Sequence, residues 1–426
     1  MDSNVSEGKR FYGWISLAMA GLVMFLFTGI FFMSFGIFMP ILCKEFGWSR
    51  GAVSGAFSVA MIIAGILGPF AGMFIAKYGA RRSIIIGNIL FALGFVVLTF
   101  QKELWHLYAG FGVIAGLGYS FGGFLPAVTI ANNWFLRKRS MAMSIVMASG
   151  GVGGLVLAPA IMAIIGSLGW RFAYVILSAI VAVFMVIVPG IFIRNKPEDL
   201  GQIPDGMTIS ETAEAESGGP RRKLYTTPVD FTLREAVRTR ALWLVIFTSV
   251  VFMFTINMIA THQIAFLETI GIVGMVAATA AGLLSGIQVV GAVAFGISGL
   301  RYNLWPLTIA CTAAATIGMA LILITKSLSM VFLYNIVLGI GIGGFFTGNL
   351  GIPSSYYGRT HYPKIVGIVI PFATILGSTG PLIAGAMYDK SGSYTLPFTI
   401  TVILLIASVV CMVLAPPPKH PSLRNW

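Results

Sequence analysis

Twelve long runs of apolar residues, separated by short polar stretches, make up most of the chain. An α-helix needs about 20 apolar residues to cross roughly 30 Å of hydrocarbon, and each run is long enough to do so. The runs are apolar throughout, whereas the strands of membrane barrels alternate apolar and polar residues over shorter stretches. The pattern therefore predicts an all-α integral membrane protein with twelve transmembrane helices. The helices are expected to start near Trp14, Val53, Ser83, Leu107, Met141, Phe172, Leu242, Ala277, Trp305, Met330, Ile365 and Leu396.

A long polar stretch, residues 194–240, lies between the sixth and seventh runs. We expect an N-terminal six-helix bundle over residues 1–193, a cytoplasmic inter-bundle loop over 194–240, a C-terminal six-helix bundle over 241–415 and a cytoplasmic tail over 416–426. Residues 208–220 have the composition of a linker. An aromatic pair, a basic loop and a small-residue helix occur in both halves, over residues 122–159 and 344–385, which indicates that the bundles are related by pseudo-symmetry.

Composition supports a membrane protein and gives it an orientation. Hydrophobic residues are 57% of the chain and charged residues 10%, against about 25% charged in a soluble domain. With both termini cytoplasmic, most of the 27 Lys and Arg residues lie in cytoplasmic segments, where basic loops are usually found. The net charge of +13 then reflects topology, and nucleic-acid binding is a poor second interpretation. We expect a multi-pass protein of the cell membrane, specifically a bacterial inner membrane, without a cleavable signal or a disulfide framework.

Glycines and paired basic residues follow the second run, over residues 72–82. This stretch resembles the loop between the second and third helices of the major facilitator superfamily. The resemblance implies a cytoplasmic gate loop that includes Lys77, Arg81 and Arg82, with Ala76 at the position where relatives carry an acidic residue.

Two further stretches are similar to narrower families within that superfamily. Residues 132–142, with an aromatic pair and basic residues, lead into the glycine-rich stretch 150–154, and residues 195–201 open the central loop. Together they look like monocarboxylate transporters and bacterial oxalate/formate antiporters. The resemblance covers nearly the whole chain and implies two pseudo-symmetric six-helix bundles with a substrate site at the midplane between them.

No charged side chain falls well inside a predicted span, and this limits how a substrate can be bound. In monocarboxylate transporters the eighth helix typically carries an Arg, often with an acidic residue one turn before it. The resemblance puts Ala292 and Gln288 at those positions. Losing both charges together is physically coherent, because a buried carboxylate without its partner is destabilising. We therefore expect neutral polar groups to bind the substrate.

Polar side chains inside the predicted spans are the candidate site residues. Gln288 lies about 17 Å along its helix and both donates and accepts hydrogen bonds, although a bond between helices is an alternative role. Thr28 and Tyr119 lie at mid-membrane depth, where bonds to the helix backbone or to a neighbouring helix are the alternatives. His262 lies near the outer boundary and is expected to couple protons or form an outer gate, with an ordinary interfacial histidine as the alternative. The expected substrate-binding residues are Gln288, Tyr119, Asn257, Thr28 and Tyr334.

These features predict one function and leave two alternatives. We expect a secondary active transporter that works by alternating access on a small organic anion, foremost a monocarboxylate, by proton symport or anion exchange. A neutral, zwitterionic or lipophilic substrate is the first alternative, because Ala292 stands where relatives carry an Arg. A solute sensor that does not transport is the second. We expect no enzyme activity, because catalysis would want clustered His, Asp or Glu at membrane depth.

The predicted partners follow from this function. They are a small-molecule solute, protons and the lipid bilayer, with no nucleic acid, no cofactor and no metal, and we expect a monomer. The sequence has no G-x-x-x-x-G-K-[ST] phosphate-binding motif, which argues against direct ATP hydrolysis by this chain.

Overall fold

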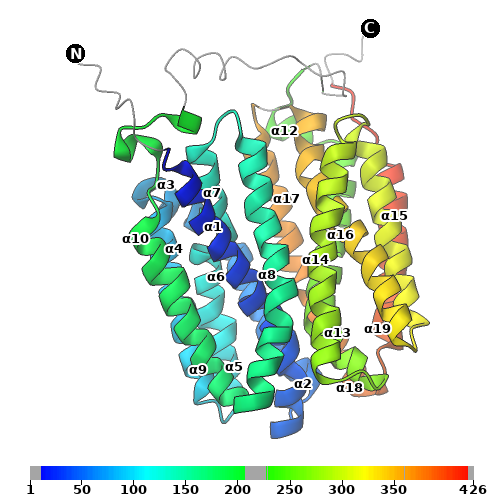
Figure 1. Ribbon diagram of the computed structural model, residues 1–426. Coiled ribbons are helices and arrows are strands. Elements are labelled where there is room, and N and C mark those ends of the chain that lie inside the picture. The colour runs from blue at the N-terminus through cyan, green and yellow to red at the C-terminus, as the bar shows by residue number, and fades with distance from the viewer. Residues whose placement is uncertain (1–10, 207–226, 228, 359, 421–426) are drawn as a thin grey trace. The chain divides into compact units, whose positions relative to one another are not determined.

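The computed structural model describes residues 11–206, 227, 229–358 and 360–420 (Figure 1). Within these residues the regular elements are helices, and twelve helical segments are long and apolar enough to cross a membrane, which confirms the predicted fold class. The predicted linker 208–220 and residues 421–426 of the tail lie outside the described residues. The spans are Gly13–Phe46, Arg50–Tyr78, Ala80–Thr99, Leu104–Trp134, Met141–Leu168, Trp170–Phe192, Arg240–Thr269, Gly274–Ser298, Leu304–Leu323, Leu328–Tyr357, Lys364–Ser391 and Thr395–Val413.

The chain divides into two compact units. Unit 1 comprises Met1–Phe31, Leu67–Gly153 and Ile164–Arg222, and unit 2 comprises Phe32–Ile66, Gly154–Ala163 and Lys223–Trp426. The last cut, after Arg222, falls inside the predicted inter-bundle loop. Two helices, α3 (Arg50–Tyr78) and α8 (Arg139–Leu168), contribute residues to both units. The predicted bundle boundaries at 193 and 241 stay a prediction.

Unit 1 is organised around α4 (Ala80–Thr99), which contacts α6 and α9 (Figure 1). Lipid tails are as apolar as the side chains, so close backbone packing does much of the work of holding such helices together. Gly118 illustrates this, because a Cβ there would lie 2.8 Å from the Phe91 nitrogen and 2.9 Å from the Gly87 oxygen. The other helices of unit 1 are α1 (Gly13–Phe27), α5 (Leu104–Leu107), α6 (Gly116–Gly122), α7 (Phe124–Trp134), α9 (Trp170–Val181) and α10 (Val188–Phe192).

The glycine-rich stretch 150–154 packs closely against other helices. In unit 1, Gly153 of α8 packs directly against the backbone of Phe25 in α1, leaving no room for a Cβ. In unit 2, a Cβ at Gly154 would lie 2.6 Å from the Cβ of Ser285. Small residues at these positions therefore let α8 pack closely against helices within each unit, as small-residue helices do in membranes.

Three described segments are π-helical, with wider turns than an α-helix; two lie in unit 1 and one begins there and ends in unit 2. They are η1 (Thr28–Met33), η2 (Tyr108–Ala115) and η3 (Ala182–Ile187). Such segments are frequent at functional sites. Two of the predicted site residues are close to them, since Thr28 opens η1 and Tyr119 follows η2 by one turn.

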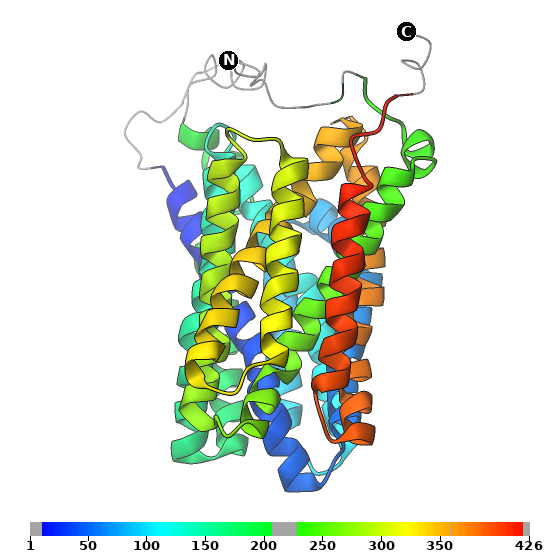
Figure 2. The same cartoon turned by 90° about the vertical axis from the view of Figure 1, so that its right-hand side faces the viewer.

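Unit 2 is built around α16 (Leu328–Tyr357), which packs against α14 (Gly274–Ser298) and α15 (Leu304–Leu323). The last helix, α19 (Thr395–Val413), runs beside α13 (Arg240–Thr269) and α15 (Figure 2). The eleventh span is interrupted at Ser378, where α17 ends and α18 begins. The remaining helices of unit 2 are α2 (Ser34–Phe46), α12 (Leu233–Val237), α17 (Tyr362–Gly377) and α18 (Thr379–Ser391).

Candidate functional site

The hydroxyl group of Thr28 is unlike those of most other threonines in the spans. Thr255 and Thr261 donate hydrogen bonds of 2.8 Å to the carbonyl oxygens of Val251 and Asn257, four residues earlier, which is the common pattern. Among the described residues Thr28 has no hydrogen-bond partner, although its side chain is half-buried. A Cβ on Gly150 would lie 2.8 Å from its Oγ1, so the hydroxyl faces the α8 glycines. The backbone bond considered as the alternative role is therefore not made.

Tyr119 packs on two phenylalanines close to Thr28 in the sequence, Phe27 and Phe31, within unit 1. Its ring centroid is 5.1 Å from that of Phe27, the residue before Thr28, and 5.1 Å from that of Phe31. The tyrosine is half-buried and comes from α6. The structure thus brings these two predicted site residues, far apart in sequence, into one neighbourhood of unit 1.

In unit 2 the amide groups of Asn257 and Gln288 are both available. Asn257 is 3% exposed and lies midway along α13, and Gln288 is half-buried midway along α14. Neither amide has a hydrogen-bond partner among the described residues. Gln288 therefore does not form the interhelical bond that was its alternative role, and both amides can take a ligand at membrane depth.

Tyr334 is placed differently from the other candidates. It is fully buried, and its hydroxyl accepts a hydrogen bond of 3.0 Å from Gln263 Nε2. The same Nε2 donates to Asn335 Oδ1 at 2.8 Å, and Asn335 Nδ2 donates to the Ala280 carbonyl oxygen at 2.9 Å. These bonds join α13, α16 and α14 inside unit 2. As a substrate ligand Tyr334 stays a prediction, and in this conformation its polar group is used in helix packing.

His262 is fully buried near the end of α13 and uses both ring nitrogens. Its Nε2 is 2.8 Å from the Pro381 carbonyl oxygen, and its Nδ1 is 3.0 Å from the Tyr394 hydroxyl. A carbonyl can only accept, so Nε2 carries the proton. In the neutral ring Nδ1 then accepts from Tyr394. Burial raises the pKa of the Tyr394 phenol, which keeps the hydroxyl protonated and able to donate.

Residues that the sequence did not single out complete what we call the His262 cluster: His262, Tyr394, Arg50, Asp389 and Ser54. Arg50 Nη1 donates to the Tyr394 hydroxyl oxygen at 2.8 Å, and the guanidinium lies 3.8 Å from the centre of the Tyr388 ring. Asp389 accepts the backbone N–H groups of Arg50 at 2.9 Å and Gly51 at 2.7 Å, which caps the start of α3. Ser54 Oγ donates to the Pro381 carbonyl oxygen at 2.9 Å. All five belong to unit 2, so the cluster joins α3, α13 and α18 in one network.

Residues 72–82, where a gate loop was predicted, are the end of α3 and the start of α4 with Gly79 between them, and they contact the start of the inter-bundle loop. The backbone N–H of Arg81 donates to Asn195 Oδ1 at 2.9 Å, and the Arg81 guanidinium donates twice to the Gly190 carbonyl oxygen. Lys77 lies 5.1 Å from the centre of the Tyr78 ring, and Arg82 is exposed. Arg81 thus has a structural contact inside unit 1, while Lys77 and Arg82 face outward, and the gate function of the three stays a prediction.

The other end of the inter-bundle loop is attached to unit 2. Phe231 packs in a buried cluster with Tyr356 and Tyr357, and its backbone N–H donates to the Tyr357 carbonyl oxygen at 2.9 Å. Glu235 accepts from the backbone N–H of Thr232 at 2.8 Å and from its hydroxyl at 2.7 Å, forming the capping box of α12. These bonds, with a smaller contribution from His420, lower the pKa of Glu235 below its ordinary value.

Charged residues are confined to the ends of the spans. Every Asp, Glu, Lys and Arg inside the twelve spans stands in a first or last turn, which confirms that the middle of each span is uncharged. Within the described residues there is also no group of three or more His, Cys, Asp or Glu that could hold a metal ion. The mid-span chemistry of both units thus consists of neutral hydroxyl and amide groups.

The chain is similar to several known proteins. Human monocarboxylate transporter 7 is 29% identical over 187 residues, which cover 43% of this chain and 35% of that protein. The aligned part therefore spans little more than a third of that relative's length. Monocarboxylate transporter 12 of Rattus norvegicus is 23% identical over 405 residues, covering 90% of this chain and 80% of the relative.

The fold has a close structural counterpart. The crystal structure of a bacterial homolog of the human lysosomal transporter Spinster superposes with a TM-score of 0.72 over 96% of this chain and 97% of the other, at 16% identity. The predicted similarity to monocarboxylate transporters and the predicted fold are both confirmed, and the relatives are transporters rather than enzymes. The family model described as Major Facilitator Superfamily matches residues 20–336 and 301–426, and the chain belongs to that superfamily.

Proposed function

We propose that this chain is a secondary active transporter that moves a small organic anion, foremost a monocarboxylate, across a membrane by alternating access. The observation that carries the proposal is the set of unpaired polar groups midway along the spans: Thr28 in unit 1, and Asn257 and Gln288 in unit 2. Polar groups at membrane depth that have no protein partner are retained where a ligand or water pairs with them. The relatives named as monocarboxylate transporters support the choice of substrate class.

Neutral donors are sufficient to hold a carboxylate. Each amide offers two N–H donors and the threonine hydroxyl one, and hydrogen bonds to a charged acceptor are stronger than those between neutral groups. In superfamily architectures built from repeats, substrate sites lie near the bilayer midplane. Tyr119 packs against Phe27, the residue before Thr28, and adds a phenol to the same part of unit 1.

We assign His262 the gate role rather than the proton-coupling role. Both of its nitrogens are used in the cluster that links α3, α13 and α18, and the neutral tautomer satisfies every bond. We further propose that both termini are cytoplasmic, which places the His262 cluster on the outer side and the loop with Lys77, Arg81 and Arg82 on the cytoplasmic side. Proton symport and anion exchange both fit this arrangement, in a cell membrane such as a bacterial inner membrane.

A neutral solute is the second candidate. The observation that favours it is the absence of any charged side chain in the middle of the twelve spans, since Gln288 and Ala292 stand at the positions predicted for a charged pair. Amide and hydroxyl groups also bind neutral hydroxylated or amide-bearing molecules, because they can both donate and accept hydrogen bonds.

Uptake into proteoliposomes tests the proposal. Labelled formate, oxalate, lactate and aromatic acids are offered with and without an inward proton gradient and with and without internal substrate. We expect carboxylate uptake that falls about tenfold or more in Gln288→Leu and is unchanged in the control Thr279→Val, an exposed residue of the same helix. Binding without uptake in folded protein would indicate a sensor, and the absence of any carboxylate uptake would favour the neutral solute.

A further inference from the structure

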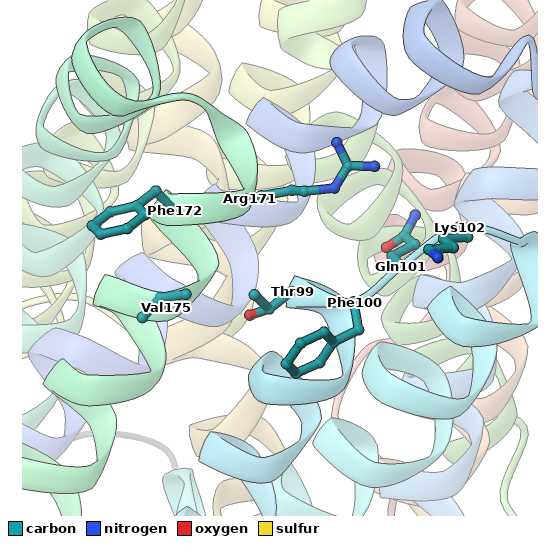
Figure 3. A pocket seen from close by; sticks show the side chains of 7 residues that line it. All are labelled: Thr99, Phe100, Gln101, Lys102, Arg171, Phe172 and Val175. Atoms are coloured by element: carbon teal, nitrogen blue, oxygen red, sulfur yellow. The ribbon is translucent and has the colours of Figure 1, made fainter.

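A cavity of about 340 Å³ opens at one end of unit 1, where α4 ends and α9 begins (Figure 3). Its walls come from Thr99, Phe100, Gln101, Lys102, Arg171, Phe172 and Val175. It is separate from the mid-span groups discussed above, because both of its segments lie at the ends of spans. The combination of apolar and basic walls at a membrane boundary needs its own explanation.

The apolar part of the wall faces the bilayer. Phe100, directly after the candidate span Ala80–Thr99, is 68% exposed, and Phe172, in the first turn of the candidate span Trp170–Phe192, is 55% exposed. Exposing this pair of aromatic rings to water is unfavourable, and in a membrane acyl chains would cover them. One side of the cavity therefore suits the upper part of a lipid tail.

The polar part of the wall is positively charged. Lys102 and Arg171 are exposed and line the cavity, and Figure 3 shows the Arg171 side chain extending toward Gln101. The N-terminus of α9, a helix of 12 residues, begins at Trp170 beside them and adds the positive end of its dipole. Glu103, which also faces solvent next to Lys102, is not part of the lining.

Gln101 supplies an independent indication that a ligand is missing. The side chain is fully buried, and neither its Nε2 nor its Oε1 has a hydrogen-bond partner among the described residues. Leaving both ends of a buried amide unpaired costs free energy. Gln101 is one of the residues that line the cavity, so ligand oxygens can pair with this amide when its side chain turns into the cavity.

We propose that this cavity binds one acidic phospholipid of the leaflet on its side of the membrane. The phosphate lies between Lys102 and Arg171, glycerol or headgroup oxygens reach the amide of Gln101, and an acyl chain covers Phe100 and Phe172. A free phosphate would leave the two exposed aromatic rings unexplained. The site is therefore assigned to the lipid rather than to a soluble anion.

Native mass spectrometry of the full-length protein tests the site. The protein is equilibrated with equal amounts of phosphatidylglycerol and phosphatidylcholine, and the lipids that stay bound are counted. We expect the wild type to retain one phosphatidylglycerol that the Lys102→Gln, Arg171→Gln double variant loses, with a 10- to 30-fold weaker affinity. Gln101→Leu should weaken retention while both charges remain. Lys326→Gln removes an exposed basic residue from another span end, and it should retain the lipid like the wild type.

Two further measurements keep the result decisive. Phosphatidylglycerol, but not phosphatidylcholine, should raise the thermal unfolding midpoint of the wild type and not that of the double variant, so a poorly folded variant is recognised by its own midpoint. Equal retention of phosphatidylglycerol by wild type and double variant would overturn the proposal. So would displacement of the lipid by low concentrations of glycerol 3-phosphate, which would make the site one for soluble phosphate esters.

Discussion

The imidazole of His262 and the phenol of Tyr394 share a hydrogen bond of 3.0 Å in which the phenol donates and the neutral ring accepts. The tyrosine oxygen in turn accepts from Arg50 at 2.8 Å. Protonation of His262 would turn Nδ1 into a donor, and the Tyr394 proton would then lose its acceptor. The network is thus consistent with a histidine that stays uncharged while the cluster is intact.

Removing the hydroxyl in Tyr394→Phe should loosen this cluster. A hydrogen bond between membrane helices contributes about 0.6–1.7 kcal/mol. Its loss corresponds to a roughly 3- to 18-fold shift from the intact His262 cluster toward a state in which the cluster is separated. Cys43 is half-buried and lies close enough to Arg50 and Asp389 to interact with them electrostatically. The shift can therefore be measured as faster maleimide labelling of Cys43 in a background without the other two cysteines.

The matched control is Tyr388→Phe. The Tyr388 ring stacks under the Arg50 guanidinium, and this ring is kept in phenylalanine. Cys43 labelling in Tyr388→Phe should equal that of the wild type. Equal labelling in Tyr394→Phe as well would show that the bond to His262 does not hold this end of unit 2 together.

Asp389 caps the first turn of α3, and Asp389→Ala should destabilise that turn. Losing an acidic N-cap costs about 1 kcal/mol, with a range of roughly 0.5–2 kcal/mol. Hydrogen exchange of the Arg50 and Gly51 amides should accelerate about fivefold, and Asp389→Asn should lie between the alanine variant and the wild type because it keeps one acceptor oxygen. Lys390→Ala, at the next position, serves as the control, and the same exchange rate in all variants would rule out the cap.

Gly118→Ala should disrupt the contact between α4 and α6. The new methyl group would lie 2.8 Å from the Phe91 nitrogen, a backbone atom that cannot move aside cheaply. Overpacking of this kind costs about 1–3 kcal/mol. Thermal unfolding in detergent measures it against Gly68→Ala, where nothing lies within 4 Å of the new Cβ. Similar midpoints for the two variants would contradict the tight packing.

Thr28→Val separates transport from stability. The valine keeps the shape of the side chain and removes a hydroxyl that has no partner in the described part of the chain, so the unfolding midpoint should not fall. Uptake at low substrate should drop about 12-fold or more, as expected for one lost hydrogen bond to a charged substrate. Thr316→Val removes a hydroxyl that only bonds the Thr312 carbonyl oxygen, and it should transport normally. A Thr28 variant with wild-type uptake would remove this residue from the proposed site.

Acidification should release the capping box of α12. Glu235 has a pKa below its unfolded value, so its contribution is complete above about pH 4.3 and is lost as the pH falls through the lower folded value. Amide protection over residues 233–237 should therefore be constant from pH 7 to about 4.3 and decline below that. Glu235→Gln should show weak protection at every pH, and protection that falls equally with acid in this variant would assign the effect to another group.

The fold was predictable from the sequence because each apolar run is long enough to be recognised alone. The predicted starts are close to the observed ones, for example Trp14 against Gly13 and Trp305 against Leu304. Where they differ, as for Val53 against Arg50, the helix begins earlier because a polar cap satisfies its first N–H groups outside the apolar run. A hydropathy pattern alone does not detect polar caps of this kind.

The candidate site was only partly predictable. Thr28, Asn257 and Gln288 were found because a lone polar residue in an apolar helix is conspicuous, whereas their lack of partners depends on packing. The contact between Arg50 and Asp389 joins residues 339 positions apart, and each one alone reads as an ordinary interfacial charge. The only sequence signal that could have pointed to it is the position of both residues at the same predicted side of the membrane.

The confinement of charge to the span ends has a consequence for membrane voltage. Moving one elementary charge through 100 mV costs about 2.3 kcal/mol, and a protein whose conformational change carries charged side chains across the field is driven by the voltage itself. Here the middle of every span is electrically neutral, so the unloaded protein has little charge to move. Any electrical current that accompanies transport is then carried by the substrate and the ions that move with it. The charge moved per transport cycle equals the net charge of those species.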